Sequence, residues 1–148
     1  MSNQPRKTAF LYLVAIGSAF AIGSAHAQEL VVKVSMVKST QGEVGCALYS
    51  SAVGFPTDNG AMPSQWQAAS TDGVVCRFTN IKPGPYAVAV SHDLNGNRRT
   101  DTNFLGMPKE DWGVSNNVRP NLRAPTFDEA RFEVAATGVT SVEVKLGK

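Results

Sequence analysis

Short stretches in which apolar residues take every second position constrain the fold of this chain more than any other feature. Neighbouring side chains of a β-strand point to opposite faces, so this alternation is typical of strands with one buried face. One example places Val44, Cys46 and Leu48 on the same face. Strands of this kind are predicted over residues 30–38, 43–50, 73–80, 86–92, 130–136 and 140–146, while residues 65–70 fit either a short strand or a turn of helix. The pattern predicts an all-β fold, a sandwich of six or seven strands.

Local motifs predict how some of these strands are connected. Pro83 pre-sets the first central position of a type II turn, and Gly84 supplies the positive φ that the second position needs. Residues 51–64 are rich in Pro, Gly, Asn and Asp and predict a loop. Thr126, followed three residues later by Glu129, predicts a capping box at the start of one helical turn over residues 126–130.

The first 27 residues have the organisation of a secretory signal peptide. Arg6 and Lys7 precede an apolar run over residues 8–23, and the small-x-small sequence at residues 25–27 is typical of a cleavage site. The run is shorter than the ~20 residues of a membrane-spanning helix, although an uncleaved anchor is the alternative. We predict a signal peptide over residues 1–27, a single domain over residues 28–148, no membrane span after cleavage, and a periplasmic or secreted bacterial location.

The charge balance limits the partners of the exported domain. The whole chain carries 14 basic and 12 acidic residues, a formal charge of +2. Arg6 and Lys7 supply that excess, so the predicted domain is formally neutral. It has no overall basic excess to attract nucleic acid or anionic lipid. We therefore predict a small ligand or an envelope partner and no nucleic acid.

The two cysteines of the chain predict one disulfide. Cys46 and Cys76 both lie on the predicted buried face of their strands, so they can meet across or between sheets. An exported protein matures in an oxidising compartment, where paired cysteines are usually bonded. Two buried free thiols are the alternative.

A long stretch rich in side-chain oxygens follows the strand at residues 86–92. Residues 93–125 show no periodicity, and loops of more than about 12–15 residues are uncommon unless they are functional or disordered. Phe104 and Trp112 make this stretch too apolar for disorder. We predict a long irregular loop that packs on the sandwich.

The spacing of four oxygen-bearing residues in this loop resembles that of a calcium loop. Relative positions 1, 3, 5 and 9 of an EF-hand loop supply oxygen ligands. Arg98 stands where such a loop has glycine, and Phe104 where it has the closing glutamate, so any affinity would be weak, on the order of 10⁻⁴–10⁻³ M. The alternative is that the Asp and Asn side chains bond their own backbone. The predicted calcium ligands are Asp93, Asn95, Asn97 and Asp101.

His92, the only histidine of residues 28–148, has two interpretations. It lies on the buried face of its strand, which favours a neutral imidazole held by Asp93 or a loop group. As a general base it would need a serine such as Ser91 or Ser115, and the chain has no Gly-x-Ser-x-Gly elbow. The sequence therefore favours a non-catalytic role, with a hydrolase using His92 as an alternative. The predicted ligand surface comprises His92, Asn103, Glu110, Trp112, Asn116 and Asn117.

Several separated motifs resemble one bacterial family of exported proteins, domain of unknown function 2141. The motifs are Pro-Gly-x-Tyr at 83–86, His-Asp-x-Asn-x-Asn at 92–97, Asp-Thr-Asn-x-x-Gly-x-Pro-Lys-Glu at 101–110, Gly-x-Ser-Asn-Asn at 113–117 and Pro-x-Phe-x-x-Ala-x-Phe at 125–132. The resemblance implies an immunoglobulin-like or transthyretin-like sandwich in the cell envelope, and it implies no activity.

This chain departs from the family pattern at two places. It has Arg98-Arg99-Thr100 where relatives often have Gly-Lys-Leu, and Arg123-Ala124-Pro125 where they have Gly-x-Pro. The first departure puts two cations beside the predicted calcium ligands. The combined prediction is an exported binding or structural module, with weak calcium binding as the first alternative.

Overall fold

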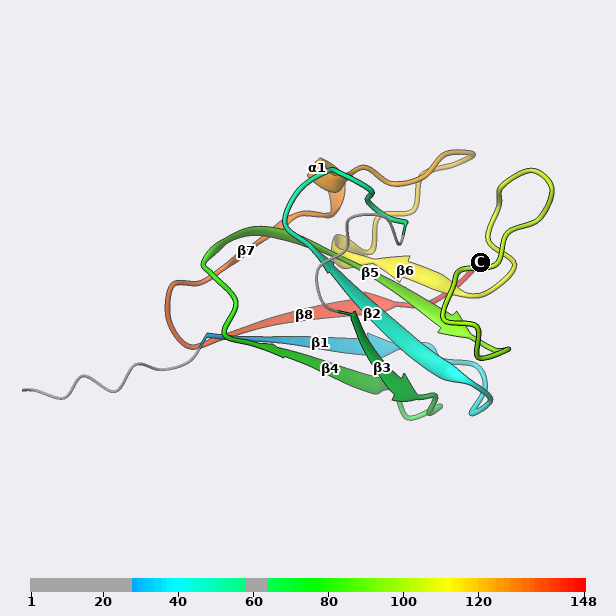
Figure 1. The fold of residues 1–148 in the computed structure, drawn as a ribbon, viewed down its shortest axis with the longest axis horizontal. Helices are drawn as coiled ribbons and strands as arrows, with labels where there is room; N and C mark the ends of the chain where they lie inside the picture. Colours follow the sequence, from blue (N-terminus) through cyan, green and yellow to red (C-terminus); the bar gives the residue numbers. More distant parts are fainter. Residues whose placement is uncertain (1–27, 58–63) are drawn as a thin grey trace, which may run out of the picture.

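Two β-sheets and almost no helix make up the computed structural model, which describes residues 28–57 and 64–148 (Figure 1). The all-β class predicted from the alternation is therefore confirmed. The predicted signal peptide and part of the predicted loop at 51–64 lie outside the described residues. Within those residues, no helix has the length and apolar character needed to cross a membrane.

Three strands form the smaller sheet, in the order β4-β1-β8. β1 (Glu29–Ser35) lies at the centre, antiparallel to β4 (Val74–Thr79) and parallel to β8 (Val139–Lys145). The first and last strands of the described chain are thus paired along their whole length. Met36, with a φ of 62°, ends the first strand three residues before the predicted boundary.

The larger sheet has five strands. Its main order is β3-β2-β5-β6, formed by β3 (Ser64–Ala68), β2 (Glu43–Tyr49), β5 (Gly84–Asp93) and β6 (Trp112–Val114). The start of β5 also pairs with β7 (Phe132–Val134). β2 and β5 share the longest antiparallel ladder of this sheet, from Glu43 opposite Asp93 to Tyr49 opposite Ala87.

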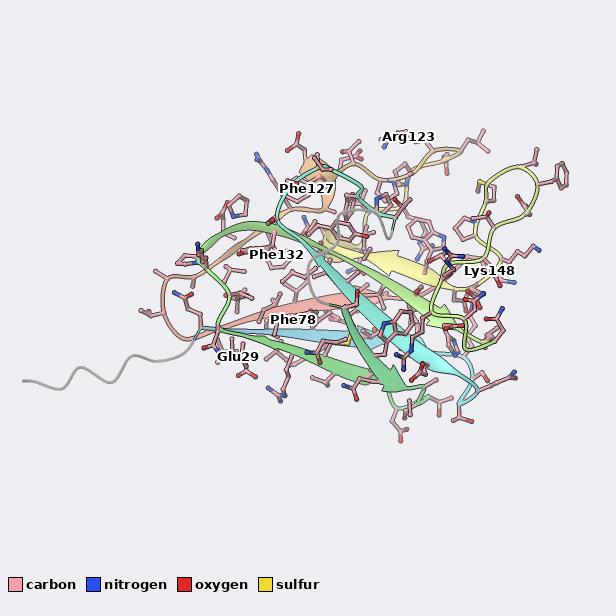
Figure 2. The ribbon with its side chains drawn as sticks, in the orientation of Figure 1. Glu29, Phe78, Arg123, Phe127, Phe132 and Lys148 are labelled. Atoms are coloured by element: carbon pink, nitrogen blue, oxygen red, sulfur yellow. A yellow bond between two sulfur atoms is a disulfide. The ribbon has the colours of Figure 1, made fainter. Side chains whose placement is uncertain are left out.

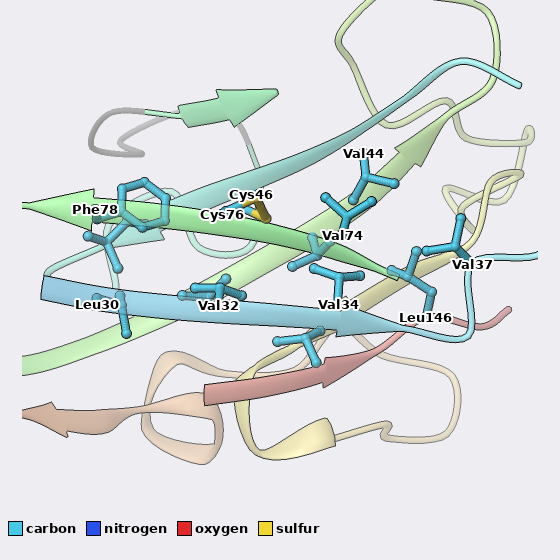
Figure 3. Close-up of a cluster of buried hydrophobic side chains, with 14 of the residues drawn as sticks. Leu30, Val32, Val34, Val37, Val44, Cys46, Val74, Cys76, Phe78 and Leu146 are labelled. Carbon is cyan, nitrogen blue, oxygen red and sulfur yellow. A yellow bond between two sulfur atoms is a disulfide. The ribbon is translucent and has the colours of Figure 1, made fainter. Parts of the chain in front are cut away.

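The core lies between the two sheets, where the predicted apolar faces meet (Figure 3). Alternate residues of β1, β2, β4 and β5 point into it, which is why the period of two was a reliable signal. Cys46 of β2 and Cys76 of β4 meet there, with Sγ atoms 2.14 Å apart. The predicted disulfide is confirmed, and it ties one sheet to the other. Core side chains include Leu30, Val32, Val34, Val44, Leu48, Val74, Phe78, Val88, Val90 and Val144.

The number of strands and the extent of the irregular loop differ from the prediction. The described part of the chain has eight strands, because residues 65–70 contribute to β3 and because β6 lies inside the stretch predicted to be irregular. β6 is only three residues long, too short for periodicity to reveal it. A 3₁₀ turn over Ser115–Asn117 follows it directly. The immunoglobulin-like or transthyretin-like assignment remains a prediction.

The capping residues take their predicted arrangement, whereas the predicted turn is borne out only in the sign of one angle. Gly84 has a positive φ, but its value of +137°, at the start of β5, differs from the ~80° of a type II turn. Thr126 caps α1 (Phe127–Ala130), and its hydroxyl accepts a hydrogen bond from the backbone N–H of Glu129. The Glu129 carboxylate in turn accepts from the Thr126 N–H at 2.9 Å, which completes the predicted capping box.

Removing the disulfide should cost much of the stability of this small domain. The bond closes a loop of 30 residues, and opening such a loop lowers the free energy of unfolding by about 3–4 kcal/mol on the chain-entropy model. We expect that loss for the Cys46→Ala/Cys76→Ala variant in urea unfolding. A reductant should weaken the wild type similarly and leave the variant unchanged. Equal urea midpoints for both proteins would contradict this prediction.

Candidate functional site

The outer face of the five-stranded sheet, which points away from the other sheet, is divided into two halves. In one half, Tyr49 of β2 and Ala87 of β5 are buried with Phe127 of α1. Phe55 stands edge-on to both aromatic rings, with centroids 5.2 Å from Tyr49 and 6.1 Å from Phe127. Further along the same strands, the face opens into a hollow.

Two tryptophans stand on opposite sides of this hollow, in one row across four strands. The strand register places Trp66 of β3 beside Gly45 of β2. Ser91 of β5 lies beside Gly45 on one side and beside Trp112 of β6 on the other. Because neighbouring strands lie about 4.8 Å apart, three strand spacings separate the backbones of the two tryptophans by about 14 Å.

Small side chains form the floor between the tryptophans. They are Gly45 and Ala47 of β2 and Ala89 and Ser91 of β5. At Gly45 a Cβ would lie 2.5 Å from the Trp66 ring, so the indole can lie against this strand only because the residue is glycine. The same two strands carry large residues toward the core, so the small residues create the hollow without weakening the inner packing.

An arginine stacks on each tryptophan. The guanidinium carbon of Arg98 lies 5.6 Å from the ring centre of Trp66, and that of Arg119 lies 4.6 Å from the ring centre of Trp112. Such contacts contribute roughly 0.5–1 kcal/mol at exposed sites. Arg119 also donates to the Trp112 carbonyl at 2.8 Å, and Arg98 donates two hydrogen bonds, of 3.0 and 3.2 Å, to Glu43. These contacts hold both indoles in place.

Two loops complete the hollow, one on each side of β6 in the sequence. The enclosed volume is about 430 Å³. We call this hollow the groove and define it by Trp66, Trp112, their small-residue floor and the two loops. The loop residues that line it are Thr100, Thr102, Leu105, Gly106, Met107, Pro108, Pro120, Leu122, Arg123, Ala124 and Pro125.

The lining of the groove is mostly apolar and has little net charge. Its polar side chains are hydroxyl groups, the indoles of the two tryptophans and the guanidinium of Arg123, and within residues 28–57 and 64–148 no carboxylate lines it. Arg123 is already paired with Glu129, as described below, so its charge is balanced. The hydroxyl residues are Tyr49, Thr57, Ser64, Ser91, Thr100 and Thr102.

Arg123, on the loop before α1, joins the groove to the capping box (Figure 2). Its two terminal nitrogens donate to the Glu129 carboxylate at 2.9 and 2.7 Å. These hydrogen bonds, followed by those from the backbone and hydroxyl of Thr126, lower the pKa of Glu129 to about 2. The same carboxylate raises the pKa of Arg123. Both groups therefore stay ionised and fix the position of this loop at neutral pH.

The oxygen-rich loop is organised around the buried carboxylate of Asp93. One oxygen accepts from the backbone N–H groups of Gly96 and Asn97, at 2.8 and 3.3 Å. The other accepts from the N–H of Arg98 at 2.5 Å. Asp93 is fully buried, so its carboxylate replaces water for three backbone donors. This is the self-bonding interpretation of the loop.

The other three predicted calcium ligands are Asn95, Asn97 and Asp101, and they lie together. The amide nitrogens of the two asparagines, and not their oxygens, face the Asp101 carboxylate. Asn95 and Asn97 each donate from the side-chain amide to Asp101, at 2.7 and 3.1 Å. Their amide oxygens accept from the backbone N–H groups of Asn97 and Arg99. Among the described residues, no three His, Cys, Asp or Glu are grouped as a metal site. Calcium binding stays a prediction, which a melting temperature measured with calcium and then with chelator would test.

Two more carboxylates of this stretch point inward. Glu110 is buried and accepts from the backbone N–H groups of Leu94 and Asp101, at 2.9 and 3.4 Å. Asp111 is also buried and pairs with the ammonium of Lys38 at 3.0 Å. Glu110 therefore closes the loop on itself, and Asp111 ties the end of the loop to the segment that follows β1.

His92 is buried and held by a loop group, as the non-catalytic interpretation of this residue predicted. Its Nε2 lies 2.8 Å from the carbonyl oxygen of Gln41, so this nitrogen carries a proton and donates. Ser91 precedes it on β5 and faces the groove, on the opposite side of the sheet. The Ser115 hydroxyl accepts from the Val88 N–H and donates to the Ala130 carbonyl. These contacts give the hydrolase alternative no support.

Of the six residues predicted to form a ligand surface, Trp112 lines the groove. Asn103 lies in one of the loops around it, where its side chain accepts from two backbone N–H groups of the same turn. Asn116 donates to the carbonyls of Glu129 and Arg131, and Asn117 bonds the backbone of β8. The sequence analysis did not identify Trp66 or the small residues of the floor as part of this site. The available signal was the run of small residues opposite the apolar face of residues 86–92.

These features define a small all-β domain with a loop-covered groove on one sheet. The chain belongs to a family of uncharacterised proteins conserved in bacteria, domain of unknown function 2141, whose family model matches residues 32–143. The resemblance seen in the separated motifs is therefore confirmed. No curated protein and no solved structure matches the chain.

The low pKa of Glu129 should be measurable and should depend on Arg123. We expect an NMR titration of its side-chain carboxyl to give a pKa of about 2, and the Arg123→Gln variant to titrate closer to the ordinary value near 4.5. Because folding lowers this pKa, the carboxylate stabilises the fold above the ordinary value, and that contribution disappears as the pH falls through about 2. A pKa that is the same in both proteins would contradict the assigned cause.

Asp93 should contribute more to stability than Asp101. Asp93→Ala removes a fully buried carboxylate and leaves the N–H groups of Gly96 and Arg98 without this acceptor, and we expect it to lower the free energy of unfolding by about 2–4 kcal/mol. Asp101→Ala, the matched control in the same loop, removes the acceptor of exposed amides and should cost under about 1 kcal/mol. Urea unfolding of both variants tests this order. An equal or reversed order would contradict the central role of Asp93.

Proposed function

We propose that this protein is a non-catalytic binding module of the bacterial cell envelope, and that its groove takes a small molecule with an uncharged, apolar body. The observation that carries this proposal is the pair of tryptophans at the two ends of one row across the sheet, with small residues between them. Small-molecule sites are concave and mostly apolar, with a few polar groups that fix orientation. The groove volume of about 430 Å³ falls within the range of roughly 300–1,000 Å³ typical of such sites.

The chemistry of the lining favours a hydrocarbon or aromatic body over a charged ligand. A buried ionic ligand would need an opposite charge to compensate for its lost hydration. Arg123 is the charged lining side chain in the described part of the chain, and it already pairs with Glu129. The hydroxyl groups can accept or donate a single hydrogen bond each, which suits a ligand with one or two uncharged polar atoms.

Two features support the envelope location. The first 27 residues have the organisation of a secretory signal peptide, and the Cys46–Cys76 disulfide suits an oxidising compartment. Neither feature depends on the groove. The location and the ligand can therefore be tested separately.

Tryptophan fluorescence offers a direct test, because both tryptophans of the chain line the groove. We expect the neutral apolar dye N-phenyl-1-naphthylamine to quench this fluorescence in a saturable way and to become brighter itself. Ala89→Leu fills the floor and should weaken dye binding by at least about tenfold, since the added side-chain volume clashes with any occupant. Ala136→Leu adds the same volume at an exposed position outside the groove and should change nothing.

The outcome for the two leucine variants decides the proposal. If the dye binds neither the wild type nor the variants, or if it binds Ala89→Leu as tightly as Ala136→Leu, the groove is not the binding site. Thermal melting of each variant should accompany the titration, so that a loss of fold is not read as a loss of binding.

A further inference from the structure

Large apolar side chains stand almost fully exposed on the two loops that line the groove. Phe104 is 95% exposed, Leu105 is 70% exposed and Leu122 is 93% exposed. Leu105 and Leu122 also line the groove, so the two loops carry apolar residues at the same place on the molecule. Figure 1 shows both loops extending beyond the sheets on the side of β6. We call Phe104, Leu105 and Leu122 the apolar tips.

The loop that carries Phe104 and Leu105 holds them outward by its own hydrogen bonds. The Asn103 N–H donates to the Met107 carbonyl at 2.8 Å, and the Gly106 N–H donates to the Asn103 carbonyl at 2.9 Å. The Asn103 side chain also accepts from the N–H groups of Leu105 and Met107. The turn is thus closed on itself, and its side chains are directed outward by a braced backbone.

Burial separates the charges of this region by sign. Between residues 92 and 112, Asp93, Glu110 and Asp111 are buried and Asp101 is partly buried, and all four bond donors of the loop, the sheet or Lys38. The exposed charges are the cations Arg98, Arg99 and Lys109. The Arg98 guanidinium pairs with Glu43 and stacks on Trp66. Arg99 and Lys109 are the other exposed cations of this stretch, and they face solvent. The formal charge of the predicted domain is zero, but these exposed cations give it a cationic surface beside the apolar tips.

We propose that the apolar tips dock this protein on an anionic lipid surface. Phe104, Leu105 and Leu122 enter the headgroup region, while Arg99 and Lys109 lie against the lipid phosphates. Peripheral contacts of this kind combine buried apolar area with electrostatic attraction to anionic lipid. Exposed cations beside exposed apolar residues favour this partner over a neutral or basic-rimmed protein surface.

The docking surface extends the proposed function without depending on it. Leu105 and Leu122 belong both to the apolar tips and to the groove lining, so docking would bring the mouth of the groove to the bilayer. An apolar ligand could then pass between membrane and groove without crossing water. Docking itself requires only the tips and their cations.

Vesicle cosedimentation of the exported protein, purified after removal of its leader, tests the proposal. We expect it to sediment with vesicles of phosphatidylglycerol and phosphatidylethanolamine in equal parts, and much less with phosphatidylcholine vesicles. Phe104→Ser/Leu105→Ser should lower the partition coefficient by at least about tenfold, since two large side chains lose their apolar burial. Val75→Ser/Val139→Ser changes two exposed valines of the smaller sheet and should bind as the wild type does.

Further variants distinguish vesicle binding from ligand binding in the groove. They also distinguish the contribution of the cations from that of the apolar tips. Arg99→Gln/Lys109→Gln should bind phosphatidylglycerol vesicles no better than phosphatidylcholine vesicles. Ala89→Leu should keep full vesicle binding, and Phe104→Ser, which changes no residue that lines the groove, should keep dye binding there. The proposal fails if the wild type does not sediment with anionic vesicles, or if the tip variant sediments as well as its valine control. If the wild type does not sediment with anionic vesicles, the exposed apolar tips would instead indicate a protein partner.

Discussion

The contrast between the two faces of β2 and β5 is the constraint on which the rest of this structure depends. Toward the smaller sheet these strands present Val44, Leu48 and Val88, which are buried, together with the disulfide to β4. Along the groove, their outer face presents glycine, alanine and serine. One face therefore stabilises the fold, and the other leaves room for a ligand. A large residue on the outer face would fill the groove without improving the core.

The oxygen-rich loop uses its polar side chains first to hold itself on the sheet. The carboxylates of Asp93 and Glu110 are buried, and backbone N–H groups satisfy their oxygens, since each buried polar group without a partner would cost about 1–3 kcal/mol. With its carboxylates directed inward, the loop exposes cations and apolar residues. The same hydrogen bonds that replace regular structure thus determine the chemistry of the surface.

The sequence predicted the features that follow from local pattern, and it missed those that need neighbouring strands. Alternation identified the class, the buried faces and the disulfide, and the capping residues identified α1 through Thr126 and Glu129. β6 has three residues, too few for a period of two to stand out. The groove depends on Trp66 and Trp112 sharing one row, which the register of four strands determines. No spacing along the chain reveals that row.

The most direct test of the account is the behaviour of the two indole N–H signals in a ¹H–¹⁵N NMR titration with 1-decanol. If the groove binds an apolar body between its walls, the signals of Trp66 and Trp112 should shift together with one dissociation constant. Backbone signals of the outer face of β1 and β4 should remain in place. Indole signals that do not move, or that move with two different constants, would contradict a single site between the two tryptophans.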